Sequence, residues 1–463
     1  MSTPALRDAT LDDKYTKTQG PVLISGPQAI VRLMLLQREV DRRAGLNTAG
    51  YVSGYRGSPV GGIDLAMWEA KTQLDASQIV FAPGVNEDLA ATAVWGTQQL
   101  RSMKENTVDG VFALWYGKGP GVDRAGDPLK HGNYAGTNAQ GGVLAVFGDD
   151  HPGKSSTIAH HSEQAMAAHG MPILYPSNVN EFVEYGLLGY ALSRYSGCWV
   201  GFKVVNETIE QTATVDIDLD ALHFERPPTG DLPPEGIHWR GSFAPMVDEM
   251  ILKRTKLPLA RKFARANGID RLAFGPAQAR FGLVTAGKAY QDTMQALNTL
   301  GLDAARAQAL GIAVYKVGMI WPLEPEGMTA FAAGKQELMF IEEKNPFVES
   351  QSAALLYNLP ARPRITGKSD ETGLPLLPSD ALLEPIEVAL AIAQRLQANG
   401  IWDEALAERV SATRSYRGAL LAVVSPGAKR LPFYCSGCPH NTSTNFPQGS
   451  VAISGIGCHG MAV

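Results

Sequence analysis

The chain has 463 residues, 45% of them hydrophobic, and a formal net charge of -5 at pH 7. This length suits about two to four domains, and the negative charge argues against nucleic acid or an anionic membrane as the main partner. No apolar run reaches the roughly 18 to 20 residues of a membrane span, and the polar first twenty residues do not resemble a secretory signal. Since four cysteines are too few for a disulfide framework, we expect a cytoplasmic protein.

The first two hundred residues predict a parallel sheet. Strands are predicted at 48–55, 79–82, 110–115, 142–147, 172–175 and 199–205, and helices at 30–40, 86–101 and 181–193. Because the strands lack polar alternation and helices separate them, the pattern is typical of an α/β fold with a sheet covered on both faces. Glycines and polar residues follow the strands, and ligands of such sheets bind at that carboxyl edge.

The rest of the chain predicts a linker and a second α/β unit. Residues 206–275 lack strong periodicity, contain two Pro-Pro pairs, and include a basic run at 253–265 that we interpret as a solvated helix. Strands at 283–287, 313–317 and 337–341 and helices at 385–397 and 401–422 form the second unit. We interpret Glu342-Glu343-Lys344, after the last of these strands, as interdomain packing. A third unit begins near residue 431.

Glu87 is the first candidate for chemistry. It follows a Pro-Gly turn at the start of a helix, where Asn86 can act as the N-cap and an acid favours the helix dipole. The small apolar run 89–96 would pack this helix closely and keep the carboxylate away from water. Two interpretations therefore stay open: an ordinary helix start, or a carboxylate that hydrogen-bonds a cofactor nitrogen.

Cations also occur at the predicted strand ends. Arg56 and Ser58 lie in a turn after the first strand, and Lys118 and Arg124 flank Gly119-Pro120-Gly121. Such residues suit a substrate carboxylate, although a plain tight turn explains them equally well. The nearby histidines, His151, His160 and His161, follow no standard zinc spacing, so we expect no metal there.

Three of the four cysteines lie in the last thirty residues. Cys435 and Cys438 form a C-x-x-C step, and nineteen residues separate Cys438 from Cys458. This pattern suits metal ligands: zinc with His440 or His459 as the fourth ligand, or a [4Fe–4S] cluster with one more cysteine. We expect the chain to end before the site is complete, and a 463-residue product to be inactive.

Several segments together resemble the indolepyruvate ferredoxin oxidoreductases, in particular the long fused bacterial form, within the 2-oxoacid:ferredoxin oxidoreductases. The resemblance extends from about residue 20 and is most specific at 115–124, 148–151 with 155–156, 194–201 and 435–440. It implies a parallel-sheet thiamine-diphosphate-binding fold. The implied division is a tail at 1–20, a pyrimidine-binding domain at 21–245, a linker at 246–275, a transketolase C-terminal-like domain at 276–395, a helical connector at 396–430, and the truncated start of a pyrophosphate-binding domain at 431–463.

The resemblance also implies roles for the candidate residues. Glu87 corresponds to the acid that hydrogen-bonds the N1′ atom of thiamine diphosphate, and Gly57, Pro59 and His440 fall in cofactor-binding segments. The four cation and hydroxyl candidates at the strand ends would bind the substrate, although Arg56-Gly57 departs from the family's Tyr-Pro-x-Thr-Pro turn. The cysteines match three ligands of a [4Fe–4S] cluster, whose fourth ligand, like the Mg²⁺ ligands, would lie downstream.

The implied reaction is oxidative decarboxylation of an indolepyruvate-type 2-oxoacid to an acyl-CoA. Coenzyme A would be the cosubstrate, electrons would pass through iron–sulfur to ferredoxin or a similar acceptor, and the complete protein would be a homodimer. Two alternatives remain: a non-oxidative thiamine-diphosphate decarboxylase or synthase, and a catalytically inert fragment with a Cys3His zinc site.

Overall fold

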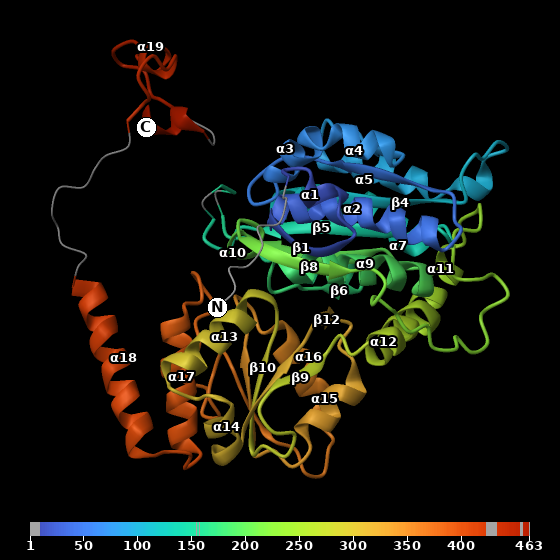
Figure 1. Cartoon of the computed structure of the whole chain (residues 1–463). Coiled ribbons are helices and arrows are strands. Elements are labelled where there is room, and N and C mark those ends of the chain that lie inside the picture. The colour runs from blue at the N-terminus through green and yellow to red at the C-terminus, as the bar shows by residue number, and fades with distance from the viewer. Residues whose placement is uncertain (1–9, 154, 157, 423–432, 454–456, 463) are drawn as a thin grey trace, which may run out of the picture.

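Two α/β units form the body of the chain in the computed structural model, which describes residues 10–153, 155–156, 158–422, 433–453 and 457–462 (Figure 1). The first unit is built on a seven-stranded sheet of order β12-β6-β7-β5-β4-β2-β3. Its strands are β2 (Thr48–Gly54), β3 (Ile79–Phe81), β4 (Gly110–Lys118), β5 (Val143–Asp149), β6 (Ile173–Leu174), β7 (Val200–Val205) and β12 (Met319–Trp321). All neighbours are parallel except β12, which is antiparallel to β6. The predicted parallel sheet is therefore confirmed.

Side chains of β4 alternate between two cores. Phe112 and Leu114 belong to the core that includes residues of α2 (Gly26–Arg43), α3 (Gly62–Glu69) and α9 (Val179–Ser196). Ala113 and Trp115 belong to the core that includes residues of α5 (Glu87–Thr97), α6 (Gly119–Arg124) and α7 (Gly126–Ala135). Because successive strand residues point to opposite faces, helices cover both faces of the sheet, as its apolar strands predict.

Shorter elements complete the first unit. The helices are α1 (Asp13–Thr16), α4 (Lys71–Ala76), α8 (Glu163–Ala168) and α10 (Asn206–Ile209). β1 (Gln19–Ser25) pairs with β8 (Thr212–Asp218) in a separate antiparallel ribbon.

The second unit has a five-stranded sheet of order β14-β13-β10-β11-β9. The strands are β9 (Arg271–Phe274), β10 (Phe281–Thr285), β11 (Ile312–Lys316), β13 (Glu337–Ile341) and β14 (Arg364–Thr366), and only β9 is antiparallel to its neighbour. The helices are α13 (Gly287–Thr299), α14 (Ala304–Leu310), α15 (Pro325–Ala332), α16 (Phe347–Leu356), α17 (Pro385–Ala398) and α18 (Glu404–Ala422). Two 2.8 Å hydrogen bonds from Arg395 to the buried Glu337 fasten α17 to β13.

Residues 246–275 differ from the expected linker. They contain most of α11 (Pro245–Ile251), all of α12 (Leu257–Ala266), and β9. The basic run is not fully solvated either, since Leu259 and Phe263 are buried and Lys256 is only 1% exposed, with its ammonium 3.2 Å from the carbonyl of Tyr134. Burial lowers the pKa of Lys256 to about 8. Basic residues lie between the apolar positions of α12, so its amphipathic pattern is difficult to recognise in the sequence.

One strand joins the two units. β12 follows β11 of the second sheet in the chain but pairs with β6 of the first. Asp270 holds the start of β12 by accepting hydrogen bonds from the amides of Gly318 (2.8 Å) and Met319 (3.0 Å). The tail was expected to open a third unit; its described part contains α19 (His440–Ser443) and a 3-10 turn at Cys458–Ala462. In the described ranges no helix is long and apolar enough to cross a membrane.

Candidate active site at the carboxyl edge of the first sheet

The Glu87 carboxylate lies at the carboxyl edge of the seven-stranded sheet. Asn86 caps α5 by accepting a 2.8 Å hydrogen bond from the amide of Leu89, and the indole of Trp115 donates to the carbonyl of Glu87 at 3.0 Å. The Glu87 side chain is only 8% exposed, and no other described residue forms a hydrogen bond or ion pair with its carboxylate. The carboxylate oxygens of Glu87 are not among the enclosed polar atoms that lack a partner, so they remain accessible to a ligand at this edge.

Glycines make the space that this carboxylate occupies. A Cβ atom at Gly121 would lie 2.6 Å from Cγ of Glu87, and one at Gly117 would lie 3.4 Å from the same atom. Both glycines belong to the segment that runs from the end of β4 into α6. The glycine-rich turn predicted from the sequence therefore places its bare backbone against Glu87.

The turn after β2 lies at the same edge. Pro59 is buried, and its Cγ atom would be 2.8 Å from a Cβ atom at Gly148, the penultimate residue of β5. Arg56 and Ser58 are exposed. Gly57 faces the stem of Lys118, whose Cδ atom would be 2.8 Å from a Cβ at that glycine. The structure thus brings Gly57, Ser58, Pro59 and Lys118 together.

Ser155 connects three strand ends. Its hydroxyl donates to the carbonyl of Ser58 at 3.0 Å, and its own carbonyl accepts from the Lys118 ammonium at 3.1 Å. Its amide donates to Asp150, just after β5, at 2.6 Å. Ser155 lies in one of the segments that carry the family resemblance, but the sequence did not predict this bridging position, because its partners are far apart in the chain.

The two remaining cation candidates are placed differently. Arg56 lines a cavity of about 180 Å³ together with Asp64 and Trp68. The hydroxyl of Tyr116 donates to Asp64 at 2.6 Å, and burial together with this neighbour raises the pKa of Tyr116. Arg124 is exposed on α6, and no hydrogen bond or ion pair joins it to Lys118 or Ser58 in the described part of the chain. Of the two cations flanking the glycines, only Lys118 is joined to the turn after β2.

The histidines after β5 do not gather around one point. His151 is buried against Glu343 of the second unit, His160 lies over Gly119, and His161 pairs with Asn345. Among the described residues, no group of three or more His, Cys, Asp or Glu side chains is placed to hold a metal ion. Of the segment Glu342-Glu343-Lys344, for which interdomain packing was predicted, Glu343 makes such a contact with His151.

The cysteine tail has a partly formed arrangement. The amide of Cys438 donates to the carbonyl of Cys435 at 3.0 Å, and its sulfur lies 3.2 Å from Nδ1 of His440. Cys435 and Cys458 are exposed. Since no three-ligand group occurs in the described ranges, the three thiols do not converge there.

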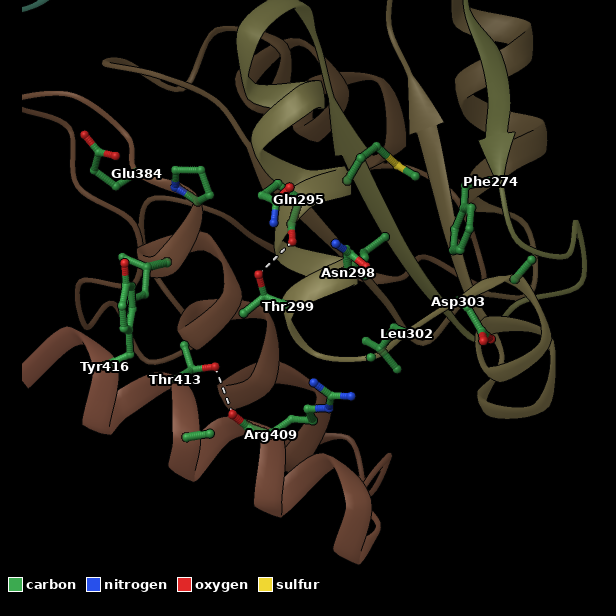
Figure 2. Close-up of a pocket in the computed structure, with 17 residues that line it drawn as sticks. Phe274, Gln295, Asn298, Thr299, Leu302, Asp303, Glu384, Arg409, Thr413 and Tyr416 are labelled. Carbon is green, nitrogen blue, oxygen red and sulfur yellow. Dashed lines mark hydrogen bonds between the residues drawn. The ribbon is translucent and has the colours of Figure 1, made fainter. Parts of the chain in front are cut away.

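A groove of about 1100 Å³ lies elsewhere, on the second unit (Figure 2). Arg409, Thr413 and Tyr416 of α18 line one side, and Gln295 and Thr299 of α13 line another. α13 starts at the carboxyl end of β10, so its last turn lies toward the amino edge of that sheet. The groove is therefore remote from the strand ends that contact the first unit.

Comparisons with known proteins show that the chain resembles indolepyruvate oxidoreductase subunits. Residues 271–419 match a family model described as the indolepyruvate oxidoreductase domain. The indolepyruvate oxidoreductase subunit IorA of Methanothermobacter marburgensis is 23% identical over 411 residues, covering 88% of this chain and 59% of that protein. The same subunit of Pyrococcus abyssi is 25% identical over 374 residues, covering 76% and 52%. The chain is thus similar to indolepyruvate oxidoreductase subunits over most of its length.

The chain spans between half and three fifths of the length of these indolepyruvate oxidoreductase subunits. Among solved structures, a 2-oxoglutarate:ferredoxin oxidoreductase from Magnetococcus marinus, with 2-oxoglutarate, coenzyme A and succinyl-CoA bound, matches with a TM-score of 0.56 and 14% identity. The match covers 82% of this chain and 66% of that chain. It supports the α/β architecture with largely parallel sheets, and at this identity it shows the fold alone.

Proposed function

We propose that this relative of the indolepyruvate oxidoreductases contributes the cofactor-activating acid of a thiamine-diphosphate-dependent 2-oxoacid oxidoreductase. The observation that carries the proposal is the Glu87 carboxylate, which is buried, has no hydrogen-bond partner among the described residues, and lies against Gly117 and Gly121. Because its oxygens are accessible and no described side chain binds them, the carboxylate can accept a hydrogen bond from a ligand at this edge.

The aminopyrimidine ring of thiamine diphosphate fits this requirement. Bound at this edge, the cofactor supplies a carbon nucleophile and an electron sink for decarboxylation. Glu87 would share a proton with the ring nitrogen N1′, and the Trp115 indole would keep the first turn of α5 in place through the carbonyl of Glu87. Gly57 and Pro59 lie in the turn after β2, at the same edge of the sheet.

Lys118 is the best-placed cation for a substrate carboxylate. Its ammonium is held by the carbonyl of Ser155 and still has donors to spare, because an ammonium carries three N–H groups. The hydroxyl of Ser58 is exposed at the same edge. We propose an indolepyruvate-type 2-oxoacid as the substrate, with the acyl group passing to coenzyme A and the electrons to ferredoxin or a similar acceptor. A homodimer of the complete protein belongs to the same proposal.

The described tail does not itself fit a [4Fe–4S] cluster, because Cys435, Cys438 and Cys458 form no three-ligand group there. We therefore derive no electron-transfer step through these thiols. We propose His440 as a cofactor contact; its ring stacks on Tyr434 with centroids 5.4 Å apart and lies beside the Cys438 sulfur.

The test is turnover of the complete enzyme with indolepyruvate, coenzyme A and a viologen acceptor under anaerobic conditions. Glu87→Gln should lower turnover by about 100-fold or more, the usual effect of losing a proton-transferring group. Asp88→Asn is the matched control, since it changes the next acid of the same helix and should leave turnover near the wild-type level. Equal turnover of Glu87→Gln and wild type would remove Glu87 from the mechanism.

The products separate this reading from its alternatives. Acyl-CoA together with reduced viologen supports the oxidative reaction. Aldehyde or a condensation product, with no reduced viologen, would favour a non-oxidative decarboxylase or synthase instead.

A further inference from the structure

The described residues between β5 and α8 (150–153, 155–156 and 158–162) form what we call the edge segment. Both of its ends contact the second unit, and its middle contacts the candidate active site. No step of the proposed reaction uses the contacts with the second unit. They come from one short stretch, Glu343-Lys344-Asn345, that follows β13.

The first contact joins two buried groups. Nδ1 of His151 lies against a carboxylate oxygen of Glu343, and the side chains are 1% and 4% exposed. The other oxygen of Glu343 is 3.1 Å from the ammonium of Lys288, which is in turn 2.9 Å from Asp292. Glu343 therefore lies between a cation of its own unit and an imidazole of the first unit. Replacing Glu343 by a neutral residue would remove one of the two carboxylates beside the Lys288 ammonium.

The second contact holds the other end of the edge segment. The side-chain amide of Asn345 is 2.8 Å from Nε2 of His161. Between the two contacts, Lys344 has φ = 55°, in the left-handed region that a side chain disfavours. A turn of this kind costs energy and persists only where its surroundings impose it.

From these contacts a short path leads to the substrate side. Asp150, next to His151, accepts the amide of Ser155 at 2.6 Å and the side-chain amide of Asn206 at 3.4 Å. Ser155 then holds the carbonyl of Ser58 and the ammonium of Lys118. The position of Lys118 thus depends on the edge segment, and both ends of the edge segment depend on the second unit.

We infer that Glu343 and Asn345 are positioning residues, through which the second unit fixes the edge segment and thereby the placement of Lys118 and Ser58. That the second unit fixes the edge segment follows from the contacts in the structure. Only the consequence for substrate binding rests on the proposed function. The second unit accordingly acts on the active site although none of its described side chains forms a hydrogen bond or ion pair with Glu87 or Lys118.

Hydrogen exchange followed by mass spectrometry tests the inference on the 463-residue chain. In Glu343→Gln and in Asn345→Ala, peptides covering the edge segment and the turn 55–59 should exchange about tenfold faster than in wild type. Peptides of α17 should exchange at the wild-type rate. Since Asn345 is exposed, its variant decides the outcome if Glu343→Gln does not fold.

Glu342→Gln is the matched control. Glu342 adjoins Glu343 but accepts hydrogen bonds from the amides of Val348 (2.7 Å) and Glu349 (2.8 Å) at the start of α16. Its replacement should leave the edge segment protected. Wild-type exchange of the edge segment in Asn345→Ala, or equal acceleration in Glu342→Gln and Glu343→Gln, would overturn the inference.

The complete enzyme gives a second readout. Asn345→Ala should raise the KM for the 2-oxoacid by about tenfold while changing kcat much less, since a displaced Lys118 weakens substrate binding. An unchanged KM would contradict the positioning role. If wild type shows no turnover, the proposed function fails, and hydrogen exchange alone then decides whether the second unit fixes the edge segment.

Discussion

A Cβ atom at Gly121 would lie 2.6 Å from Cγ and 2.8 Å from Oε1 of Glu87. The missing side chain at residue 121 is therefore what allows this carboxylate to occupy its place beside α6. The atoms that a methyl group would meet belong to the end of a flexible side chain, not to backbone. We expect Gly121→Ala to displace the acid while leaving the fold intact.

In Gly121→Ala, turnover should fall by tenfold or more, since a displaced acid no longer meets the cofactor; the free energy of unfolding should change by less than about 2 kcal/mol. Gly96→Ala is the comparison, because no atom lies within 4 Å of a Cβ at that position in α5. It should stabilise the protein by about 1 kcal/mol, the helix-propensity gain from glycine to alanine, and leave turnover unchanged. Urea unfolding and steady-state kinetics measure both effects, and full activity of Gly121→Ala would contradict the assigned position of Glu87.

The buried Glu343 predicts a pH dependence of stability. Burial by itself would raise its pKa, but His151 and Lys288 together hold that pKa at about 2, below the usual 4.5. Because the folded-state pKa is depressed, the carboxylate stabilises the fold fully above about pH 5 and loses this effect as the pH falls toward 2. The difference amounts to about 3 kcal/mol.

Glu343→Gln should therefore lower the free energy of unfolding at pH 7 by about 3 kcal/mol and make its decline between pH 5 and pH 2 shallower. Urea titrations across that range measure both. Asp403→Asn, which breaks an exposed ion pair with Arg306, should cost less than about 1 kcal/mol. Parallel pH profiles of Glu343→Gln and wild type would show that the depressed pKa is not a source of stability.

The sequence offers Lys118 and Arg124 equally as substrate-binding cations, but in the structure only Lys118 is linked to the turn after β2. Lys118→Gln should raise the KM for the 2-oxoacid by about 10- to 100-fold, the range for losing a charge-assisted hydrogen bond. Arg124→Gln should have little effect, since Arg124 is exposed and unconnected to Ser58 or Lys118 in the described residues. A larger KM change in Arg124→Gln than in Lys118→Gln would reverse this assignment.

The cysteines predict a selective chemical reactivity. Cys435 and Cys458 are exposed, whereas Cys198 is fully buried and burial raises its pKa to about 11. Since the thiolate is the reactive form, brief alkylation of the native protein should modify the tail thiols and spare Cys198. Peptide mass spectrometry reads the pattern, and early modification of Cys198 would be inconsistent with its buried position.

Metal analysis tests the ligand role of the same thiols. If the tail thiols ligate a metal after anaerobic reconstitution with iron and sulfide, or with zinc, Cys438→Ser should bind less metal than wild type, while Cys198→Ser should bind as much. Zinc bound at one ion per chain would favour the Cys3His alternative, and iron with sulfide would favour the cluster. Equal metal content in all three proteins would remove the cysteine tail as a metal site.

Much of the first unit could be predicted from sequence because buried parallel strands consist of short runs of apolar residues. β4 and β5 were recognised in this way, and the glycines and acids that follow them marked the carboxyl edge. The start of α5 at Glu87 agrees with the predicted N-cap at Asn86. These features depend on local patterns, which a single sequence contains in full.

The missed features depend on pairs that are distant in the chain. Ser155 gains its position from Ser58 and Lys118, and His151 gains its position from Glu343. The amphipathic face of α12 was not recognised because the basic residues Arg261 and Lys262 interrupt the apolar positions between Leu259 and Phe263. The tail thiols had the spacing of ligands, but spacing alone does not fix whether three side chains converge.

β12 has a consequence for how the protein can be made. The seven-stranded sheet takes its edge strand from Met319–Trp321, beyond the first three strands of the five-stranded sheet. During synthesis that sheet cannot be completed until the ribosome has passed residue 321, and a gene fragment that stops near residue 275 leaves β6 as an open edge. Exposed edges invite pairing between chains. Recombinant expression of the first unit by itself should therefore give aggregates, and a usable truncation has to retain β12.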